Sequence, residues 1–422
     1  MPVLVPVPIP SPDPEHAHPM QTLLITGPGG AGRTTVAAAT ALAAARDGQR
    51  VLLLSGDPGD PLAALVGEPV GESADAAPGL RAAEVAGGFR VARIDPGEGF
   101  REEFAALQER GSALLGMLGA RPLGAEELTE LPGAEQFALL RALRRAATAP
   151  GTDLVVVDMP PLHQAVATLA LPAQLRRYLA RLLPAERQAA RALRPVLAQL
   201  AGVPMPAQWL YEAAARWDEE LAAVQAVIEA GTTRVRLVAE PGPAAHAALR
   251  AGVTGLALHE LGIADLVANR LVPQDRTDPW VISVGAQQLA FLKDWGQDLT
   301  ALELPHLGRD PQGPADLAEL TGLAAGGSLT PGRPGSHRRW PVEDRLDEDG
   351  VLVWAVSLPH ARKSDLDLIR RGDELLLTAG PYRRIVLLPS ALRRCTVSGA
   401  ALADGVLRIR FTPDPGLWPR TS

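Results

Sequence analysis

Cysteine is almost absent from this sequence, because Cys395 is the single cysteine among 422 residues. One thiol can form neither a disulfide within the chain nor a zinc site built from cysteine pairs, so both of these stabilising devices are excluded. So little cysteine suits a reducing compartment, and we expect the protein to be cytoplasmic.

Long apolar runs are also missing. No stretch of about 18 residues is apolar throughout and free of charge, so the sequence predicts no membrane-spanning helix. Residues 1–19 alternate proline with valine and isoleucine and lack the basic start of a secretory signal peptide. We expect these residues to form a disordered, proline-rich tail.

The chain also lacks an excess of basic residues. The chain has 41 Lys and Arg against 48 Asp and Glu, which gives a net charge of -7. Nucleic-acid binding relies on a concentrated basic surface, so this balance argues against nucleic acid as a main partner. The length and the hydrophobic share of 47% instead predict a globular protein with two domains, or one large domain with an appendage.

Short apolar runs alternate with longer helical stretches from residue 20 to residue 321. Several runs lack polar alternation, as strands do when both faces of a sheet are buried. The pattern predicts an α/β domain in which helices cover a parallel sheet. The expected strands are Thr22–Thr26, Val51–Ser55, Phe89–Ile94, Leu154–Val157, Val235–Ala239, Leu266–Asn269 and Leu302–Leu304.

A long helical insertion, Pro172–Gly231, separates the fourth and fifth of these runs. Apolar residues in its second half recur at helical spacing, so one face of this helix is apolar. That face either packs into the core or offers a hydrophobic surface to a partner, and the spacing fits both. The residues of this face are Trp209, Leu210, Ala213, Trp217, Leu221, Val224 and Ile228.

The composition changes again near the C-terminus. Residues 322–336 are rich in glycine, serine and proline, and we predict that they form a linker. In residues 337–422, short runs bounded by turns follow one another without a helical stretch, which predicts a small all-β sandwich. Its expected strands are Val351–Val356, Asp365–Ile369, Glu374–Thr378, Arg384–Leu388, Thr396–Val397 and Val406–Phe411.

One glycine-rich segment carries the strongest chemical signal. Residues 27–34 read GPGGAGRT, directly after an apolar strand and directly before an alanine-rich helix. Glycines let backbone amides converge on a phosphate, and the helix N-terminus favours negative charge, so this is a P-loop for ATP or ADP with Mg²⁺. The residues expected to bind the nucleotide here are Gly27, Gly29, Gly30, Ala31, Gly32, Arg33, Thr34 and Thr35, and the Thr34 hydroxyl is also expected to bind Mg²⁺.

The stretch TGPGGAGRTTVAAATALAAARDGQRVLLLSGDP resembles the start of the arsenite-transport and tail-anchored-protein-targeting ATPases. The resemblance continues in GDPGDPLAALVG, LPGAE, DLVVVDMPPLH and LPAQLRRYL. It implies that Asp57 orients the attacking water, that Asp158 contacts the Mg²⁺ shell, and that Asn269 lies against the adenine ring. It also implies a homodimer. Read without the resemblance, each of these residues could simply cap a turn.

The sequence departs from that family at several positions. Pro28 stands where family members carry a second lysine, and Arg33 replaces the usual lysine with a larger, planar group. The second switch has Met159 where the family favours a small hydroxyl residue, and the first switch has Gly59 and Asp60 in place of a histidine. These changes remove charge stabilisation of the transferring phosphoryl group, which puts hydrolysis in doubt.

The segment from Val353 to Phe411 resembles the small-heat-shock, α-crystallin-like sandwich that is appended to some bacterial members of this family. The segment after Phe411 lacks the I-x-I type of motif that chaperone members use for assembly. We therefore expect this domain to act as a docking element or lid within a dimer.

Three functions remain open from the sequence. The first is an ATP-binding dimeric switch that couples ATP binding or slow hydrolysis to a protein client or membrane partner. The second is a nucleotide-binding scaffold that does not hydrolyse ATP. The third is a chaperone-like interaction protein, which is disfavoured because the chain has only 5 methionines to form an adaptable client groove.

Overall fold

The computed structural model describes residues 20–56, 61–67, 74–77, 80–110, 121–183, 208–275, 277–332 and 340–418. Asp57, the predicted catalytic residue, lies outside the described residues, as do Gly59, Asp60 and the predicted tail at 1–19.

A nine-stranded sheet forms the centre of the molecule, in the order β3-β4-β5-β2-β6-β1-β7-β8-β9. Seven strands pair in parallel, and they confirm the predicted α/β fold and all seven expected strands. They are β1 (Gln21–Thr26), β2 (Val51–Ser55), β5 (Phe89–Arg93), β6 (Leu154–Asp158), β7 (Thr233–Ala239), β8 (Ile263–Leu271) and β9 (Ala301–Pro305).

Two antiparallel strands at one edge of this sheet were missed in the sequence. They are β3 (Ala74–Ala77) and β4 (Leu80–Val85), and β4 pairs with β5. Strand β4 has a mixed pattern of buried and exposed residues instead of a continuous apolar run, since it lies near the edge of the sheet.

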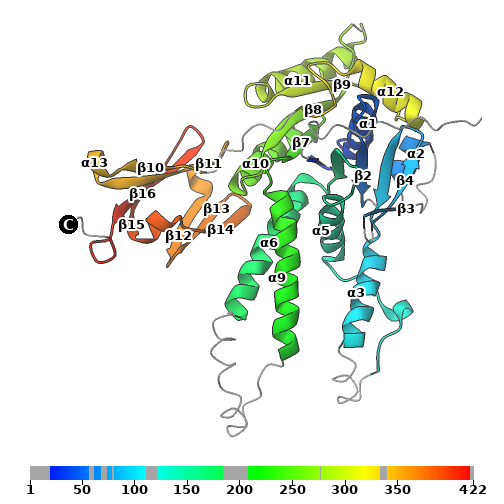
Figure 1. Cartoon of the computed structure of the whole chain (residues 1–422). Helices are drawn as coiled ribbons and strands as arrows, with labels where there is room; N and C mark the ends of the chain where they lie inside the picture. Colours follow the sequence, from blue (N-terminus) through cyan, green and yellow to red (C-terminus); the bar gives the residue numbers. More distant parts are fainter. Residues whose placement is uncertain are drawn as a thin grey trace, which may run out of the picture.

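Helices cover both faces of the sheet (Figure 1). One face packs against α1 (Arg33–Arg46), α2 (Pro61–Val66) and α12 (Gly313–Leu323). The other face packs against a second core that includes α5 (Ala134–Ala146), α6 (Leu162–Leu182), α9 (Gln208–Ile228), α10 (Pro243–Leu258) and α11 (Pro279–Trp295). The helix α3 (Pro96–Arg110) contacts α5.

Helices α6 and α9 form a hairpin that projects away from the sheet (Figure 1). Leu221, Val224 and Ile228 of α9 are buried, so this part of its apolar face belongs to the core. Trp217 is 45% exposed and meets the ring of Phe137 edge-on, with 5.9 Å between the ring centroids. The side chains of the first residues of α9 lie outside the described part of the chain.

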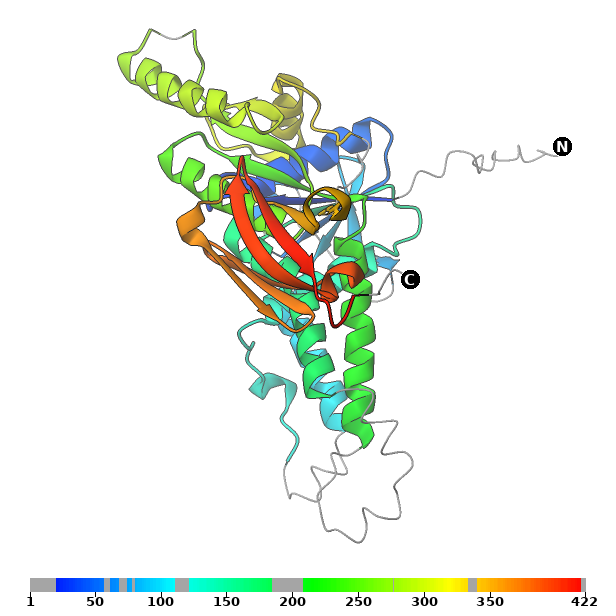
Figure 2. The same cartoon turned by 90° about the vertical axis from the view of Figure 1, so that its left-hand side faces the viewer.

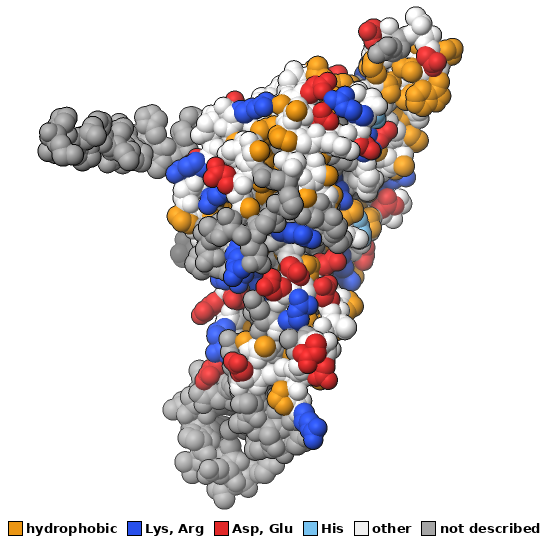
Figure 3. Space-filling view, turned by 90° about the vertical axis from the view of Figure 1, so that its right-hand side faces the viewer, with side chains coloured by type: hydrophobic (Ala, Val, Ile, Leu, Met, Phe, Trp, Pro, Cys, Tyr) orange, Lys and Arg blue, Asp and Glu red, His pale blue; other side chains and the backbone are white. Residues whose placement is uncertain are grey.

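The surface of the molecule mixes both signs of charge. On the face drawn in Figure 3, basic and acidic side chains of the described residues are interspersed. Among the described residues, no helix combines the length and the apolar character that a membrane crossing requires.

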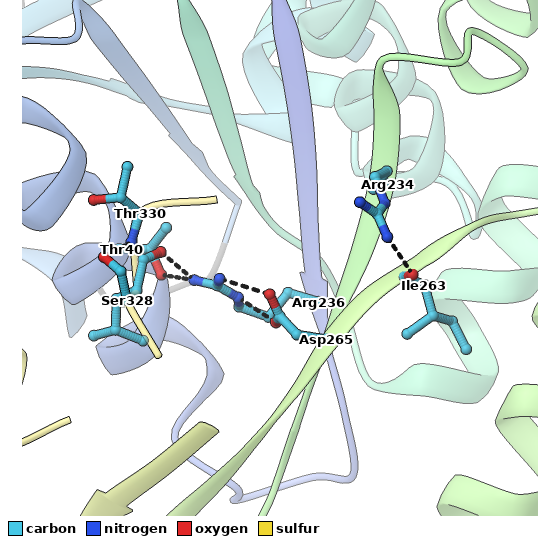
Figure 4. Close-up of polar contacts among 8 residues, drawn as sticks. Thr40, Arg234, Arg236, Ile263, Asp265, Ser328 and Thr330 are labelled. Atoms are coloured by element: carbon cyan, nitrogen blue, oxygen red, sulfur yellow. Dashed lines mark hydrogen bonds and ion pairs between the residues drawn. The ribbon is translucent and has the colours of Figure 1, made fainter. Parts of the chain in front are cut away.

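The predicted linker begins within α12, and its next residues lie against the central sheet. Ala325 forms a β-bridge with Glu303 of β9, and Leu329 is 2% exposed. The Leu329 carbonyl accepts a hydrogen bond of 2.6 Å from Arg236, whose side chain is fully buried (Figure 4). The described part of this segment is therefore packed, while the division of the chain into domains remains a prediction.

Two antiparallel sheets follow and confirm the all-β C-terminal region, which lies in front of the central sheet in Figure 2. The four-stranded sheet contains β10 (Val342–Arg345), β11 (Val351–Ser357), β16 (Val406–Pro413) and β15 (Cys395–Ala403). The three-stranded sheet contains β12 (Leu366–Arg371), β13 (Glu374–Ala379) and β14 (Tyr382–Leu387). Strand β10, which has no buried residue, was missed in the sequence.

The C-terminal sheets pack directly on α10 of the α/β region. The Thr254 hydroxyl donates a hydrogen bond of 2.6 Å to the Pro359 carbonyl. Gly255 faces the ring of Tyr382 so closely that a Cβ atom there would lie 2.8 Å from it. Buried residues of both regions belong to one continuous apolar cluster, so the two parts share a core.

Candidate nucleotide-binding site

The glycine-rich loop between β1 and α1 is held tightly against its neighbours. A Cβ atom on Gly27 would lie 1.8 Å from the carbonyl oxygen of Val238, so only glycine fits there. Gly30 and Gly32 have φ values of 76° and 84°, in the left-handed region that glycine adopts without strain. The sequence therefore fixes the backbone path of this loop.

The loop ends where α1 begins, at Arg33. The first N–H groups of a helix have no partner within the helix, and the helix dipole makes this end positive. Five alanines of α1 are completely buried, because the sheet covers one side of the helix and α2 and α12 cover others; they are Ala37, Ala38, Ala39, Ala41 and Ala44. Their small side chains bring the start of α1 close to the carboxyl ends of the strands, where phosphate oxygens would be received.

Asp158 meets two hydroxyl groups at the end of β6. Its Oδ2 atom accepts a hydrogen bond of 2.7 Å from Thr34, and the Ser55 Oγ atom lies 3.4 Å from the same oxygen. Ser55 is directly opposite Asp158 because β2 pairs with β6 in that register. A carboxylate beside hydroxyl groups, next to the phosphate loop, is a donor set that fits Mg²⁺ bound with a nucleotide.

The segment that follows Asp158 is fastened to the loop. The Thr26 hydroxyl donates to the Pro160 carbonyl at 2.8 Å, and the Leu162 amide donates to the Gly27 carbonyl at 2.9 Å. The Arg33 guanidinium donates a hydrogen bond to the Met159 carbonyl. Arg33 is thus turned toward the predicted second switch.

Asn269 lies on β8 and supports the glycine-rich loop. Its side chain is 5% exposed, and its Nδ2 atom donates a hydrogen bond of 2.8 Å to the Ala31 carbonyl. The contact with adenine that the family resemblance implies stays a prediction. The next residue, Arg270, has a φ of 59° and donates a hydrogen bond of 3.0 Å to the Gly30 carbonyl.

The structure brings the predicted loop residues, Asp158 and Asn269 together at the carboxyl ends of the parallel strands. Sequence reasoning missed Ser55, Thr26 and Arg270. The first two end β2 and β1, so a polar residue at the carboxyl end of a parallel strand was the available signal.

Comparison with known proteins agrees with this geometry. Residues 20–322 match the anion-transporting ATPase family, and residues 349–411 match the HSP20-like domain found in ArsA. Both resemblances seen in the sequence are therefore confirmed.

Several relatives extend over nearly the whole chain. An uncharacterized protein of Streptomyces coelicolor is 55% identical over 402 residues, which are 95% of this chain and 100% of that protein. A Mycobacterium tuberculosis protein is 30% identical over 434 residues, covering 94% of this chain and 97% of its own length. A protein of Aquifex aeolicus named as a candidate arsenical pump-driving ATPase is 23% identical over 384 residues, covering 89% of this chain and 95% of its own length.

A shorter similarity links the chain to ATPase GET3 of Paracoccidioides lutzii, which is 23% identical over 185 residues, 44% of this chain and 52% of that protein. The family match covers most of the chain and contains the loop, Asp158 and Asn269. The chain belongs to the anion-transporting ATPase family, a family of nucleotide-binding ATPases.

Proposed function

We propose that this protein is a dimeric, ATP-binding switch that couples the binding or slow hydrolysis of ATP to a partner in the cytoplasm. The observation that carries the proposal is the hydrogen bond of 2.7 Å between the Thr34 hydroxyl and the Asp158 carboxylate, beside the glycine loop. This pair would hold the Mg²⁺ of a bound nucleotide, which would neutralise charge on the outer phosphates.

We expect slow hydrolysis because the loop departs from the family sequence at two positions, Pro28 and Arg33. Pro28 has no side-chain donor, so it offers no charge to the nucleotide. Arg33 keeps its charge, but its guanidinium is bonded to the Met159 carbonyl. A bound γ-phosphate would have to draw Arg33 away from Met159, and this competition would link nucleotide binding to the segment that leads into α6.

A second function is supported by the same two residues. If Arg33 remains on Met159 when ATP binds, the developing charge on the phosphoryl group lacks its main stabilisation. The protein would then act as a nucleotide-binding scaffold that does not turn over.

The deciding experiment measures Mg²⁺-ATP binding by calorimetry and phosphate release on the wild type and on a Pro28→Lys, Arg33→Lys double variant. We expect the wild type to bind ATP and to release phosphate slowly, and Asp57→Asn to abolish the release. Turnover by the double variant alone would favour the scaffold, and a wild type without affinity for Mg²⁺-ATP would contradict both functions.

The dimer is tested separately by sedimentation velocity. We expect a dimer of this chain whose population rises with Mg²⁺-ATP, since the resemblance implies that two copies face each other across their nucleotides. A monomer at all nucleotide and protein concentrations would contradict this part of the proposal.

A further inference from the structure

A wide groove separates the α6–α9 hairpin from the three-stranded C-terminal sheet. Its volume is about 1610 Å³, and its walls come from α6, α9, β13, β14 and the short helix α14 (Ser390–Arg393). Small-molecule sites usually occupy up to about 1,000 Å³, so this space suits a polypeptide segment better. None of the nucleotide-site residues named above lines the groove.

One face of the three-stranded sheet forms a wall of this groove. Strand pairing aligns Glu374 with Leu387, and Leu376 with Ile385, so these side chains share a face. Leu387 is 67% exposed, and Tyr178 across the groove on α6 is 50% exposed. The wall therefore presents apolar surface that the described part of the chain leaves uncovered.

The charge of the groove is opposite to that of the chain. Seven arginines and four acidic residues line it, while the whole protein has a net charge of -7. Three of the four acidic residues are bound by arginines in ion pairs of 2.8 to 2.9 Å. These pairs are Arg176–Asp218, Arg177–Glu374 and Arg384–Glu260.

Glu374 is the most strongly held of these acids. Both of its oxygens accept hydrogen bonds of 2.8 Å from Arg177, and Arg181 lies 3.3 Å away. These hydrogen bonds hold the pKa of the Glu374 carboxyl below its usual range. The charge of the Glu374 carboxylate is therefore balanced by Arg177 and Arg181, so Glu374 does not repel an acidic ligand.

Two further arginines are available to a ligand. Arg371 and Arg383 are exposed, line the groove, and form no ion pair with any described residue. Arg371 ends β12 in the same row as Leu387, and Arg383 is four residues from Leu387 on β14. Four residues of an extended strand span roughly 13 Å. Leu387 and Ile385 therefore lie between Arg383, on their own strand, and Arg371, which is two strands away beyond the ion-paired Glu374.

We propose that this groove binds an extended polypeptide segment of a partner protein in which two acidic residues, four positions apart, flank an apolar residue. In an extended segment, residues two apart point to the same side. The apolar residue would lie on Leu387 and Ile385, and the two carboxylates would reach Arg371 and Arg383. This site goes beyond the nucleotide switch and does not depend on it.

The test uses a fluorescein-labelled heptapeptide, Ser-Glu-Thr-Leu-Thr-Glu-Ser, and the full chain without nucleotide. A second peptide with lysine in place of both glutamates is the control. Fluorescence anisotropy should give an affinity about tenfold or more higher for the acidic peptide, which corresponds to about 1.4 kcal/mol. The affinity should fall as salt is raised, because the attraction is between exposed charges.

An Arg371→Glu, Arg383→Glu double variant should reverse the preference, so that the lysine peptide binds better. The matched control is Arg408→Glu, Arg410→Glu, two exposed residues of β16 that do not line the groove, and it should leave the preference unchanged. Circular dichroism and Mg²⁺-ATP binding on the same samples establish that each variant is folded and that the nucleotide site is independent.

Several outcomes would overturn the proposal. They are a wild type that does not bind the acidic peptide, equal binding of both peptides, and equal effects of the two double variants. Displacement of the peptide by millimolar phosphate or glutamate would identify a small-anion site instead. Loss of self-association when the peptide is added would identify a second copy of this chain as the occupant.

Discussion

Gly27 has no space for a side chain, since any Cβ atom would run into the Val238 carbonyl. We expect Gly27→Ala to destabilise the protein by about 1 to 3 kcal/mol, the usual range for overfilling a packed site. Gly29 is the matched control, because a Cβ atom there meets nothing within 4 Å. Gly29→Ala should change the free energy of unfolding by less than about 0.5 kcal/mol in urea melts. Equal losses in both variants would contradict this account.

Arg236 is a fully buried charge that depends on its partners. Its guanidinium bonds to both Asp265 oxygens at 2.6 and 2.8 Å and to the Thr40 hydroxyl at 2.8 Å (Figure 4). Arg236→Met leaves the Asp265 carboxylate unpaired and should cost about 3 to 5 kcal/mol in denaturant melts. Arg234→Met removes a single hydrogen bond to the Ile263 carbonyl and should cost about 1 kcal/mol.

An Arg236→Met, Asp265→Leu double variant tests whether the stability lost in Arg236→Met comes from the unpaired carboxylate or from poorer packing. If the cost comes from the unpaired carboxylate, removing that carboxylate as well should recover most of the stability. A double variant as unstable as Arg236→Met alone would mean that packing, and not charge, is responsible.

His259 makes stability depend on pH. Burial, aided by the positive charge of Arg384, lowers the pKa of His259 from 6.5 to about 3. The unfolded chain therefore takes up a proton that the folded protein excludes, so the stability is full above pH 6.5 and falls as the pH is lowered. Between pH 7 and pH 5 we expect a loss of roughly 1 to 2 kcal/mol from this residue.

Urea melts at several pH values check this prediction. His259→Gln should remove that part of the pH dependence, so its unfolding free energy should fall less between pH 7 and pH 5 than that of the wild type. An unchanged slope in His259→Gln would contradict the assignment.

At the scale of elements, helix α6 connects the phosphate loop with the C-terminal sheet. It begins at Leu162, directly after the segment that is bonded to the phosphate loop, and farther along it Arg177 binds Glu374 of β13. The two side chains are 20% and 17% exposed, so solvent screens them only in part. A double-mutant cycle with Arg177→Gln and Glu374→Gln should give a coupling of about 1 to 3 kcal/mol. A coupling near zero would mean that this contact does not fasten the β region to α6.

Strands and helices were predictable from the sequence where their hydrophobic pattern is strong. Seven short apolar runs identified seven strands of the sheet, and several of them lack polar alternation because a parallel strand buried on both faces needs no polar residues. Strands β3, β4 and β10 were missed, since β3 and β4 lie at or next to the sheet edge, β4 has a mixed pattern of buried and exposed residues, and β10 has no buried residue. The sequence predicted one helical insertion from Pro172 to Gly231, whereas α6 already begins at Leu162 and Pro172 lies inside it. It also left open which part of α9 is core.

At the scale of the whole molecule, the shared core predicts cooperative unfolding. Tyr382 of the C-terminal sheet packs against Gly255 of α10, and buried residues on both sides form one cluster. Calorimetry should give one thermal transition for the wild type and two for Tyr382→Ala, in which this contact is lost. Leu387→Ala, at a side chain that is 67% exposed, should keep the single transition. Two transitions in the wild type would contradict a shared core.

The sequence by itself determined the features that are encoded by adjacent residues. The strand, glycine loop and helix of residues 21–46 are contiguous, so their order and residue types were enough to predict a phosphate site and the family resemblance. Asp158 and Asn269 were found only through that resemblance.

Only the tertiary structure decided which distant residues meet. Thr34 lies 124 positions from Asp158, and Ser55 lies 103 positions from it, yet the strand order β2-β6-β1 places all three side by side. The contact of Arg33 with Met159, the burial of Arg236 and the arginine-lined groove also depend on this packing. Periodicity specifies which face of a strand or helix is buried, but not which neighbour covers it.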